Sequence, residues 1–304
     1  MAATTLVLAG LAVSACGNGN AAPSGSSTPG VVNAIGAENE YANVLGQIGG
    51  RYVHVSSILN NPNTDPHTFE SSPSVASEVS AATLVIQNGV GYDTFMNTIE
   101  SASPNPDRKV IDVQKLLGLP DSTPNPHLWY NPITMPAVAK AIATDLSELQ
   151  PAHAAYFQSN ATTFVNSLSP WLADIAKVKA TFPGAPVATT EPVGDYMLQA
   201  AGTDDLTPWS FSADVMNGVD TTPQDNSFQE SLFNEHKVKV FAYNQQVTNS
   251  ITQLLLSLAE KDGIPVVGVY ETMPTPGYDY QTWMEAEATG LYNALANGTS
   301  LEKL

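Results

Sequence analysis

VVNAIGAENEYANVLGQIGGRYVHVSSIL, residues 31–59, contains in order an apolar run, a segment with helical spacing and a second apolar run. The runs at 31–37 and 53–59 have the β-branched, apolar composition of strands. Between them, the apolar residues of 38–48 recur at helical spacing, and Gly49 and Gly50 end that helix. We therefore predict a strand–helix–strand unit of the kind that builds a mainly parallel α/β sheet.

The same alternation recurs on both sides of a purely helical middle. Residues 134–182 contain no convincing strand, and Pro151 and Pro170 each suit the first turn of a helix. We predict two similar α/β lobes joined by a long rigid connecting helix, with a ligand site in the interlobe cleft. Further strands are predicted at 83–89, 109–113, 187–192, 237–244 and 264–270, and helices at 74–82, 92–99, 193–201, 248–261 and 281–296. The predicted boundaries are 1–16 for a signal segment, 17–30 for a tether, 31–150 and 185–304 for the two lobes, and 151–184 for the connecting helix.

The charge and composition exclude several function classes. Eleven Lys and Arg against 29 Asp and Glu give a formal charge of −18, which disfavours binding of nucleic acid or of an anionic membrane surface. With 43% apolar and only 13% charged residues, most of the chain is expected to fold. One cysteine excludes an intramolecular disulfide framework and a Cys-rich zinc module.

The N-terminus predicts export. Residues 1–16, MAATTLVLAGLAVSAC, form an apolar run too short for an ordinary transmembrane helix, and they resemble the hydrophobic part of a signal segment. The end of this run, VSAC, resembles a bacterial lipobox, and Cys16 is the sole cysteine of the chain, so we expect lipid attachment there. Residues 17–30 are rich in Gly, Ser, Asn, Ala and Pro, as in a flexible tether. The alternative is a frayed apolar terminus with a chance cysteine.

Four metal-binding side chains occupy equivalent loops around the predicted strands. His67 follows the strand at 53–59, and His127 lies in the loop before the helical middle. Glu191 and Glu271 follow the strands that begin at 187 and 264. Ligands in open parallel sheets lie beyond the carboxyl ends of the strands, so these side chains are expected to meet.

Two imidazoles and two carboxylates suit a divalent transition metal, because their formal charge of −2 balances the ion. Each residue alone also has an ordinary structural interpretation, as a hydrogen-bonding surface histidine or as a carboxylate at a helix N-terminus. The shared placement after strands favours ligation. The remaining histidines, at positions 54, 153 and 236, lack this placement and are not expected to be ligands.

Two motifs carry a resemblance to a known family. TDPHTFESSPS (64–74) and NPHLWYNP (125–132) are similar to the histidine regions of the cluster A-I solute-binding lipoproteins of manganese and zinc ABC importers. This resemblance covers roughly Val31 to Ala296 and implies two α/β lobes, one rigid connecting helix and a metal ion between the lobes. It places ligands at His67 and His127, and at Glu191 and Glu271 through the segments ATTEPVGDYML and VVGVYETMP. Many family members have aspartate in place of Glu271.

The resemblance implies a monomeric, non-enzymatic receptor, held to the outer face of the bacterial cytoplasmic membrane by its lipid alone, that delivers Mn²⁺ or Zn²⁺ to a membrane permease. Zinc-type members often have a third histidine where this chain has Glu191, and many carry a His-rich loop, which favours Mn²⁺ or Fe²⁺ here. Three other functions stay open: an adhesin with a structural metal, an exported metallohydrolase and a receptor for an iron chelate. No HExxH, GxSxG or Walker motif supports an enzyme.

Overall fold

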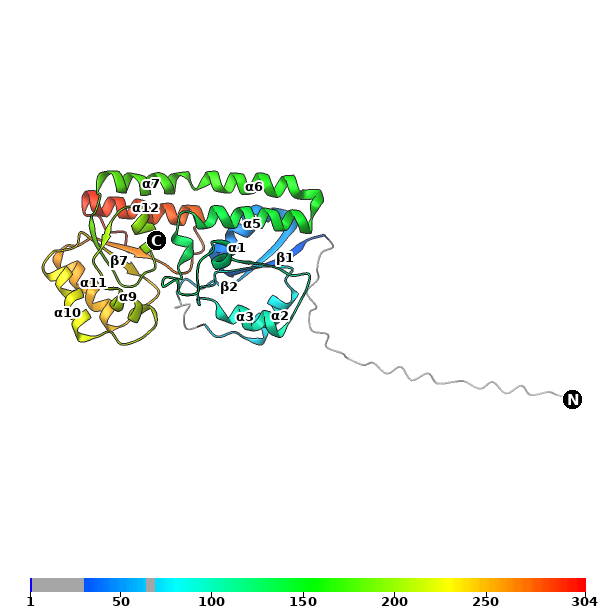
Figure 1. The fold of residues 1–304 in the computed structure, drawn as a ribbon, viewed down its shortest axis with the longest axis horizontal. Coiled ribbons are helices and arrows are strands. Elements are labelled where there is room, and N and C mark those ends of the chain that lie inside the picture. Colours follow the sequence, from blue (N-terminus) through cyan, green and yellow to red (C-terminus); the bar gives the residue numbers. More distant parts are fainter. Residues whose placement is uncertain (2–29, 64–68) are drawn as a thin grey trace.

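A computed structural model describes Met1 and residues 30–63 and 69–304. The predicted signal segment, Cys16 and His67 lie outside these residues. The described chain contains two parallel sheets of four strands each, one built from each half of the sequence (Figure 1). The prediction of two similar α/β lobes is therefore confirmed.

The N-terminal sheet has the strand order β2-β1-β3-β4. Its strand β3 is buried at every position, as expected for the centre of a parallel sheet covered on both faces. Gly36 allows a tight turn after β1, because a Cβ there would lie 2.4 Å from the backbone nitrogen of Ala42. The elements of this half are β1 (Val32–Glu38), α1 (Asn39–Gly49), η1 (Gly50–Tyr52), β2 (Val53–Leu59), α2 (Pro73–Ala81), β3 (Leu84–Gln87), α3 (Thr94–Ala102), β4 (Lys109–Asp112), α4 (Val113–Leu116) and η3 (Leu128–Tyr130).

The C-terminal sheet has the order β6-β5-β7-β8 and so repeats the topology of the first. In each half the second strand pairs with one side of the first strand, and the chain then crosses over so that the third strand pairs with the other side of the first strand. This switch point, β1/β3 in one lobe and β5/β7 in the other, is where open α/β sheets bind ligands. The elements are β5 (Pro186–Thr189), α8 (Asp195–Ala200), β6 (Asp204–Asp205), α9 (Trp209–Met216), α10 (Pro223–Asn234), β7 (Val240–Asn244), α11 (Ser250–Asp262), β8 (Val266–Val269) and α12 (Tyr280–Asn297).

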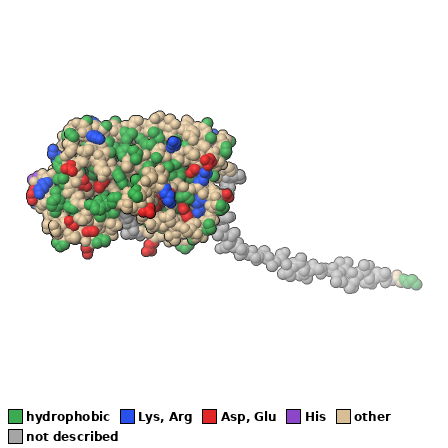
Figure 2. Space-filling view, viewed as in Figure 1, with side chains coloured by type: hydrophobic (Ala, Val, Ile, Leu, Met, Phe, Trp, Pro, Cys, Tyr) green, Lys and Arg blue, Asp and Glu red, His purple; other side chains and the backbone are tan. Residues whose placement is uncertain are grey.

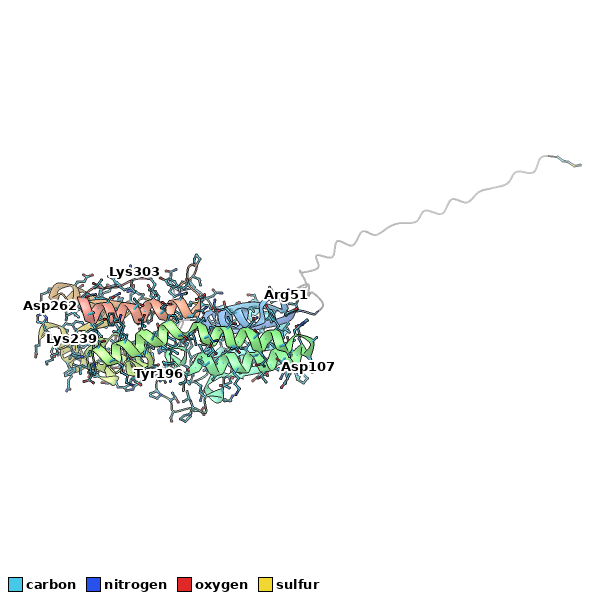
Figure 3. The ribbon with its side chains drawn as sticks, turned by 90° about the horizontal axis from the view of Figure 1, so that it is seen from above. Arg51, Asp107, Tyr196, Lys239, Asp262 and Lys303 are labelled. Atoms are coloured by element: carbon cyan, nitrogen blue, oxygen red, sulfur yellow. The ribbon has the colours of Figure 1, made fainter. Side chains whose placement is uncertain are left out.

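A helical layer runs along one side of both sheets. It consists of α5 (Thr134–Leu149), η4 (Pro151–His153), α6 (Ala154–Ser167), α7 (Ser169–Thr181) and α12. Helices α6 and α7 follow each other with only Leu168 between them and extend over both halves of the molecule (Figures 1 and 3). Pro151 begins η4 and Pro170 lies in the first turn of α7, as predicted.

The strands and helices predicted for the two lobes are all present, each displaced by at most three residues at either end, and the stretch predicted as one connecting helix comprises η4, α6 and α7. The strand predicted at 187–192 stops at Thr189, which leaves Glu191 in the following loop, and the strand predicted from 237 begins only at Val240. The division of the chain at residues 150 and 184 stays a prediction.

The largest hydrophobic core is continuous across the two halves. It joins Leu84 and Ile86 of β3 to Val187 of β5 through aromatic side chains such as Trp129 and Trp283, all of them buried. The halves therefore share apolar surface rather than only a linker. Two smaller apolar clusters lie away from this core, one in each half.

A polar seam also joins the halves, along the stripe of α1 formed by Asn39, Asn43 and Gln47. The buried Asn39 amide donates to the carbonyl of Met273 at 2.9 Å and accepts from its N–H at 3.0 Å. Asn43 accepts from the backbone N–H of Tyr280 at 3.0 Å. The Gln47 and Gln281 amides lie 3.0 Å apart. Residues four apart share one helix face, so the seam follows from the sequence spacing.

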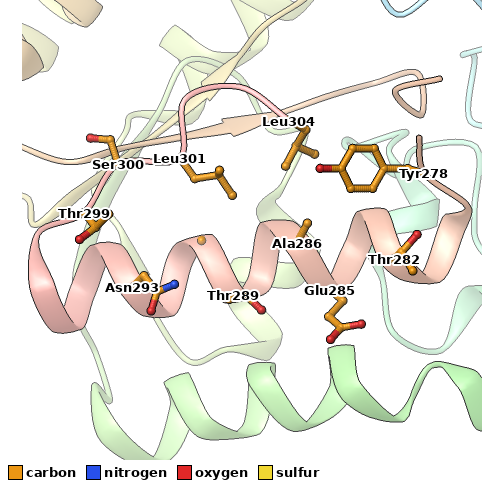
Figure 4. A pocket seen from close by; sticks show the side chains of 11 residues that line it. Tyr278, Thr282, Glu285, Ala286, Thr289, Asn293, Thr299, Ser300, Leu301 and Leu304 are labelled. Carbon is orange, nitrogen blue, oxygen red and sulfur yellow. The ribbon is translucent and has the colours of Figure 1, made fainter. Parts of the chain in front are cut away.

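The C-terminal segment extends the second sheet and runs back alongside α12 (Figure 4). Leu301 exchanges backbone hydrogen bonds with this sheet, donating to Val266 at 2.9 Å and accepting from Gly268 at 2.8 Å. Its side chain packs on Gly290, where a Cβ would approach within 2.8 Å. Between this segment and α12 lies a cavity of about 440 Å³, whose lining includes Tyr278.

The surface in Figure 2 carries few, scattered Lys and Arg side chains among acidic, apolar and neutral ones. This agrees with the formal charge of −18. No helix within the described ranges is long and apolar enough to cross a membrane.

Candidate metal centre

Three predicted ligands meet where the two lobes face each other. His127 lies just before η3 in the N-terminal half, and Glu191 and Glu271 lie just beyond β5 and β8 in the C-terminal half. At most 1% of each residue is exposed. The carboxyl ends of β5 and β8 and the loop before η3 thus deliver these side chains to one buried place, as the sequence predicts.

One amide group holds both carboxylates. The side-chain nitrogen of Asn244, the last residue of β7, donates to Glu191 Oε1 at 2.7 Å and to Glu271 Oε1 at 2.8 Å. An amide nitrogen carries two protons, so each carboxylate receives one. On the other side of the Glu271 carboxylate, Oε2 lies 3.4 Å from His127 Nε2 and accepts from the Tyr92 hydroxyl at 3.1 Å.

Asn125 orients the imidazole. Its side-chain oxygen lies 2.8 Å from His127 Nδ1 and also accepts from the His127 backbone N–H at 3.0 Å. Its nitrogen donates to the carbonyl of Pro192 at 2.7 Å, which fixes the orientation of the amide. The oxygen therefore faces Nδ1, which must carry the proton, and the lone pair of Nε2 points towards Glu271. This tautomer is the one that binds a metal through Nε2.

Gln246 fixes the backbone that carries Glu271. Its side-chain oxygen accepts from the N–H groups of Glu271 and Thr272 at 2.6 and 2.7 Å. Its own N–H donates to Asn244 Oδ1 at 2.9 Å. Gln246, which positions the loop, and Asn244, which positions the carboxylates, are therefore linked directly.

Three further acidic residues, Glu38, Glu40 and Asp93, lie buried nearby. Burial raises the pKa of Glu38 and of Glu40 well above the ordinary value, with Asp93 adding to the rise at Glu38 and Glu271 to the rise at Glu40. Burial also raises the pKa of Asp93 to about 6, although the backbone N–H groups of Asn88 and Gly89 oppose the rise. The raised pKa values favour the neutral form of Glu38 and Glu40, which lessens the repulsion next to Glu271.

The structure thus brings together His127, Glu191 and Glu271, while the fourth predicted ligand, His67, lies outside the described residues. Within residues 30–63 and 69–304, no three His, Cys, Asp or Glu side chains are arranged so that they alone could hold a metal ion. His54 is exposed on β2, and His153 stacks on Tyr52 at a centroid distance of 3.8 Å, away from the site.

Sequence reasoning missed the roles of Asn244, Asn125, Gln246 and Tyr92. The signal for Asn244 was present, since it ends the strand predicted at 237–244 and so meets the same criterion as the ligands. Gln246 follows two residues later in the same loop. No sequence pattern identifies Tyr92, because its partner Glu271 lies 179 positions away.

These features define a class of protein: a two-lobed α/β binding protein with a buried imidazole–carboxylate site between lobes of the same topology. The chain belongs to the ZnuA family, described as zinc-uptake complex component A, periplasmic, which matches residues 37–294. The resemblance to the solute-binding proteins of manganese and zinc importers is therefore confirmed.

Individual relatives agree with this family. A metal ABC transporter substrate-binding lipoprotein of Streptococcus cristatus, ScbA, is 26% identical over 176 residues, which are 54% of this chain and 56% of that protein. The chain thus spans little more than half the length of this relative.

Two solved structures share the fold. The Mn-bound periplasmic metal-binding protein of Candidatus Liberibacter asiaticus has a TM-score of 0.71 and 19% identity, over 87% of this chain and 99% of that one. The periplasmic zinc-binding protein TroA of Treponema pallidum has a TM-score of 0.73 and 16% identity, over 89% and 100%.

Proposed function

We propose that this protein captures one divalent transition-metal ion, Mn²⁺ or Zn²⁺, between its lobes and delivers it to the membrane permease of an ABC importer. The observation that carries the proposal is the buried group of His127, Glu191 and Glu271, contributed by both lobes and oriented by Asn125 and Asn244. His67 completes the set as the fourth ligand.

The geometry suits an ion. His127 Nε2 and Glu271 Oε2 are two acceptor atoms 3.4 Å apart. Two ligand atoms that each lie about 2.1 Å from one ion at a tetrahedral angle are separated by about 3.4 Å. The carboxylates of Glu191 and Glu271 are brought together by one amide donor, and two carboxylates side by side offer the oxygen atoms and negative charge that suit a divalent cation.

The receptor is exported and held at the outer face of the bacterial cytoplasmic membrane by a lipid on Cys16, with residues 17–30 as its tether. Support comes from the family description as periplasmic and from the lipoprotein named above. It acts as a monomer and contacts the membrane through this lipid alone, with the permease as its partner and with no nucleic acid. No enzymatic activity is assigned, because the site residues fit binding of an ion.

Competitive equilibrium dialysis of metal-stripped protein against Mn²⁺ and Zn²⁺, followed by elemental analysis, tests the proposal. We expect one ion per chain in the unsubstituted protein. Affinity should fall at least about tenfold in His127→Ala and in His67→Ala, because each removes a ligand. His54→Ala, which alters an exposed histidine on β2, is the matched control and should bind normally.

Failure to bind a stoichiometric amount of either ion at micromolar concentration would refute the proposal that the protein is a metal-ion receptor. Zn²⁺ binds most ligand sets more tightly than Mn²⁺, so the ranking of the cargo comes from the competition and not from the metal that copurifies. Loss of the fold on metal removal would instead indicate a structural metal, as in the adhesin alternative.

A further inference from the structure

The Tyr130 hydroxyl lies between helix α12 and the segment that carries Glu271. It accepts from the backbone N–H of Tyr270 at 3.1 Å and lies 3.0 Å from the carbonyl of the same residue. It also lies 3.0 Å from Glu287 Oε1, on α12. Tyr130, Tyr270 and Glu287 come from sequence positions up to 157 apart, and Tyr130 and Glu287 are fully buried.

Each of these hydrogen bonds can be assigned its own proton. Glu287 Oε1 also accepts from Trp283 Nε1 at 2.6 Å. Burial raises the pKa of Glu287 to about 8, so its carboxyl group is mostly protonated at neutral pH. A protonated carboxyl group can donate to the Tyr130 oxygen, which leaves the single hydroxyl proton of Tyr130 for the carbonyl of Tyr270.

Tyr130 is also tied to both sides of the metal centre. Its backbone N–H donates to the carbonyl of His127 at 3.2 Å, within the turn η3. Its hydroxyl holds both backbone groups of Tyr270, which immediately precedes Glu271. Gln246 holds the N–H of Glu271 itself, so the backbone on both sides of this peptide bond is constrained. One side chain thus connects the histidine segment of one lobe with the carboxylate segment of the other.

We propose that Tyr130, held by Glu287, is a positioning residue that sets the Glu271 carboxylate against His127 across the interlobe site. The inference rests on the proposed metal-binding function and extends it, because neither Tyr130 nor Glu287 touches the ion. Without the hydroxyl, the backbone of Tyr270 loses two partners, and Glu271 can coordinate in a different mode.

The test combines the affinity and the visible absorption spectrum of Co²⁺-loaded full-length protein. We expect Tyr130→Phe to weaken Co²⁺ and Zn²⁺ binding by about tenfold, the scale seen for groups that orient metal ligands. We also expect a changed Co²⁺ spectrum, because that spectrum reports the number and arrangement of ligands. A substitution that merely destabilises the fold leaves the spectrum of the folded, loaded fraction unchanged.

Glu287 supplies an independent pair of variants. Glu287→Gln keeps an oxygen in the position of Oε1, which accepts from Trp283 and can accept from Tyr130, so Tyr130 stays held and the affinity and spectrum should stay close to those of the unsubstituted protein. Glu287→Met removes this oxygen and should reproduce Tyr130→Phe. Tyr292→Phe removes a phenol hydroxyl elsewhere on α12 and serves as the control.

An unchanged Co²⁺ spectrum and affinity in Tyr130→Phe would overturn the inference, as would equal behaviour of Glu287→Gln and Glu287→Met. Failure of the unsubstituted protein to bind any metal would instead refute the proposed function, so the two failures are distinguishable.

Discussion

At the residue scale, amide side chains do much of the positioning in this site. Asn125 selects the tautomer of His127, Asn244 divides its two protons between Glu191 and Glu271, and Gln246 holds the loop that carries Glu271. Amides suit this task because they are uncharged donors and acceptors, so they orient ligands without competing for the ion as carboxylates would.

Asp195, four residues beyond Glu191, provides a pH-dependent prediction. Burial, with a contribution from Asp205, raises the pKa of Asp195 to about 8. The folded protein keeps this proton up to about pH 8, whereas the unfolded chain loses it near pH 4. The contribution of the Asp195 carboxyl group to the free energy of unfolding is therefore full below about pH 4 and is lost as pH rises towards 8. Asp195→Asn should remove that loss, which is on the order of a few kcal/mol.

Urea unfolding of the metal-free protein at pH 5, 7 and 9 checks this prediction. The free energy of unfolding should decline less steeply with pH in Asp195→Asn than in the unsubstituted protein. Asp204→Asn, at an exposed position of β6, is the matched control and should follow the unsubstituted protein. Parallel pH curves for Asp195→Asn and the unsubstituted protein would contradict a raised pKa.

At the element scale, α1 connects the lobes. Its apolar residues, among them Val44, Leu45 and Ile48, enter the shared core. In its polar stripe, Asn39 bonds to Met273 in the segment between β8 and α12, while Asn43 and Gln47 bond to the first turn of α12. One helix therefore carries an apolar face for stability and a polar stripe that fixes the position of the loop after Glu271.

Asn39→Ala should lower both stability and metal affinity. The substitution leaves the backbone N–H and carbonyl of Met273 without their partner, at a cost of about 1–3 kcal/mol in the free energy of unfolding. Met273 lies two residues beyond Glu271, so metal binding should weaken as well. Denaturant titration and dialysis provide the two measurements.

Gln47→Ala, at the partly exposed end of the same stripe, is the control for this variant. It should change the free energy of unfolding by no more than about 0.5 kcal/mol, because its amide groups can bond to water. If Asn39→Ala behaved like Gln47→Ala, the seam would not contribute to the position of the loop.

Elements with strong local patterns were predictable, whereas those made by tertiary pairing were not. Strand β3, LVIQ, is apolar enough to predict from its composition. Strand β6 consists only of Asp204 and Asp205, residues that strands disfavour, and it exists because it pairs with Pro186 and Val187 of β5. Helix α10 was also missed, although Thr222 caps it by accepting from the N–H of Asp225 and Pro223 follows in its first turn.

At the scale of the whole molecule, three features oppose relative motion of the lobes. These are the continuous apolar core, the helices α6 and α7 that extend along both halves, and the polar seam of α1. We therefore expect binding at the proposed metal site to need little closure of the lobes, in line with the rigid connection that the sequence resemblance implies.

The site was predictable to the extent that its residues follow strands. Glu191 and Glu271 were found because parallel strands end at one edge of a sheet, and His127 because of its motif. Their convergence depends on two sheets facing each other, and the supporting contacts join positions such as Asn244 and Glu191 that are 53 apart. No local spacing encodes such contacts, so the amide network emerged only in three dimensions.

We propose that one metal ion lies between the lobes on His127, Glu191 and Glu271. Anomalous diffraction from crystals of Mn²⁺- or Zn²⁺-loaded protein, measured on both sides of the metal absorption edge, tests this most directly. We expect a single peak about 2.0–2.2 Å from His127 Nε2 and from oxygens of both carboxylates, with His67 also bound. A peak elsewhere on the molecule, or an ion in the cleft that His127 does not bind, would contradict it.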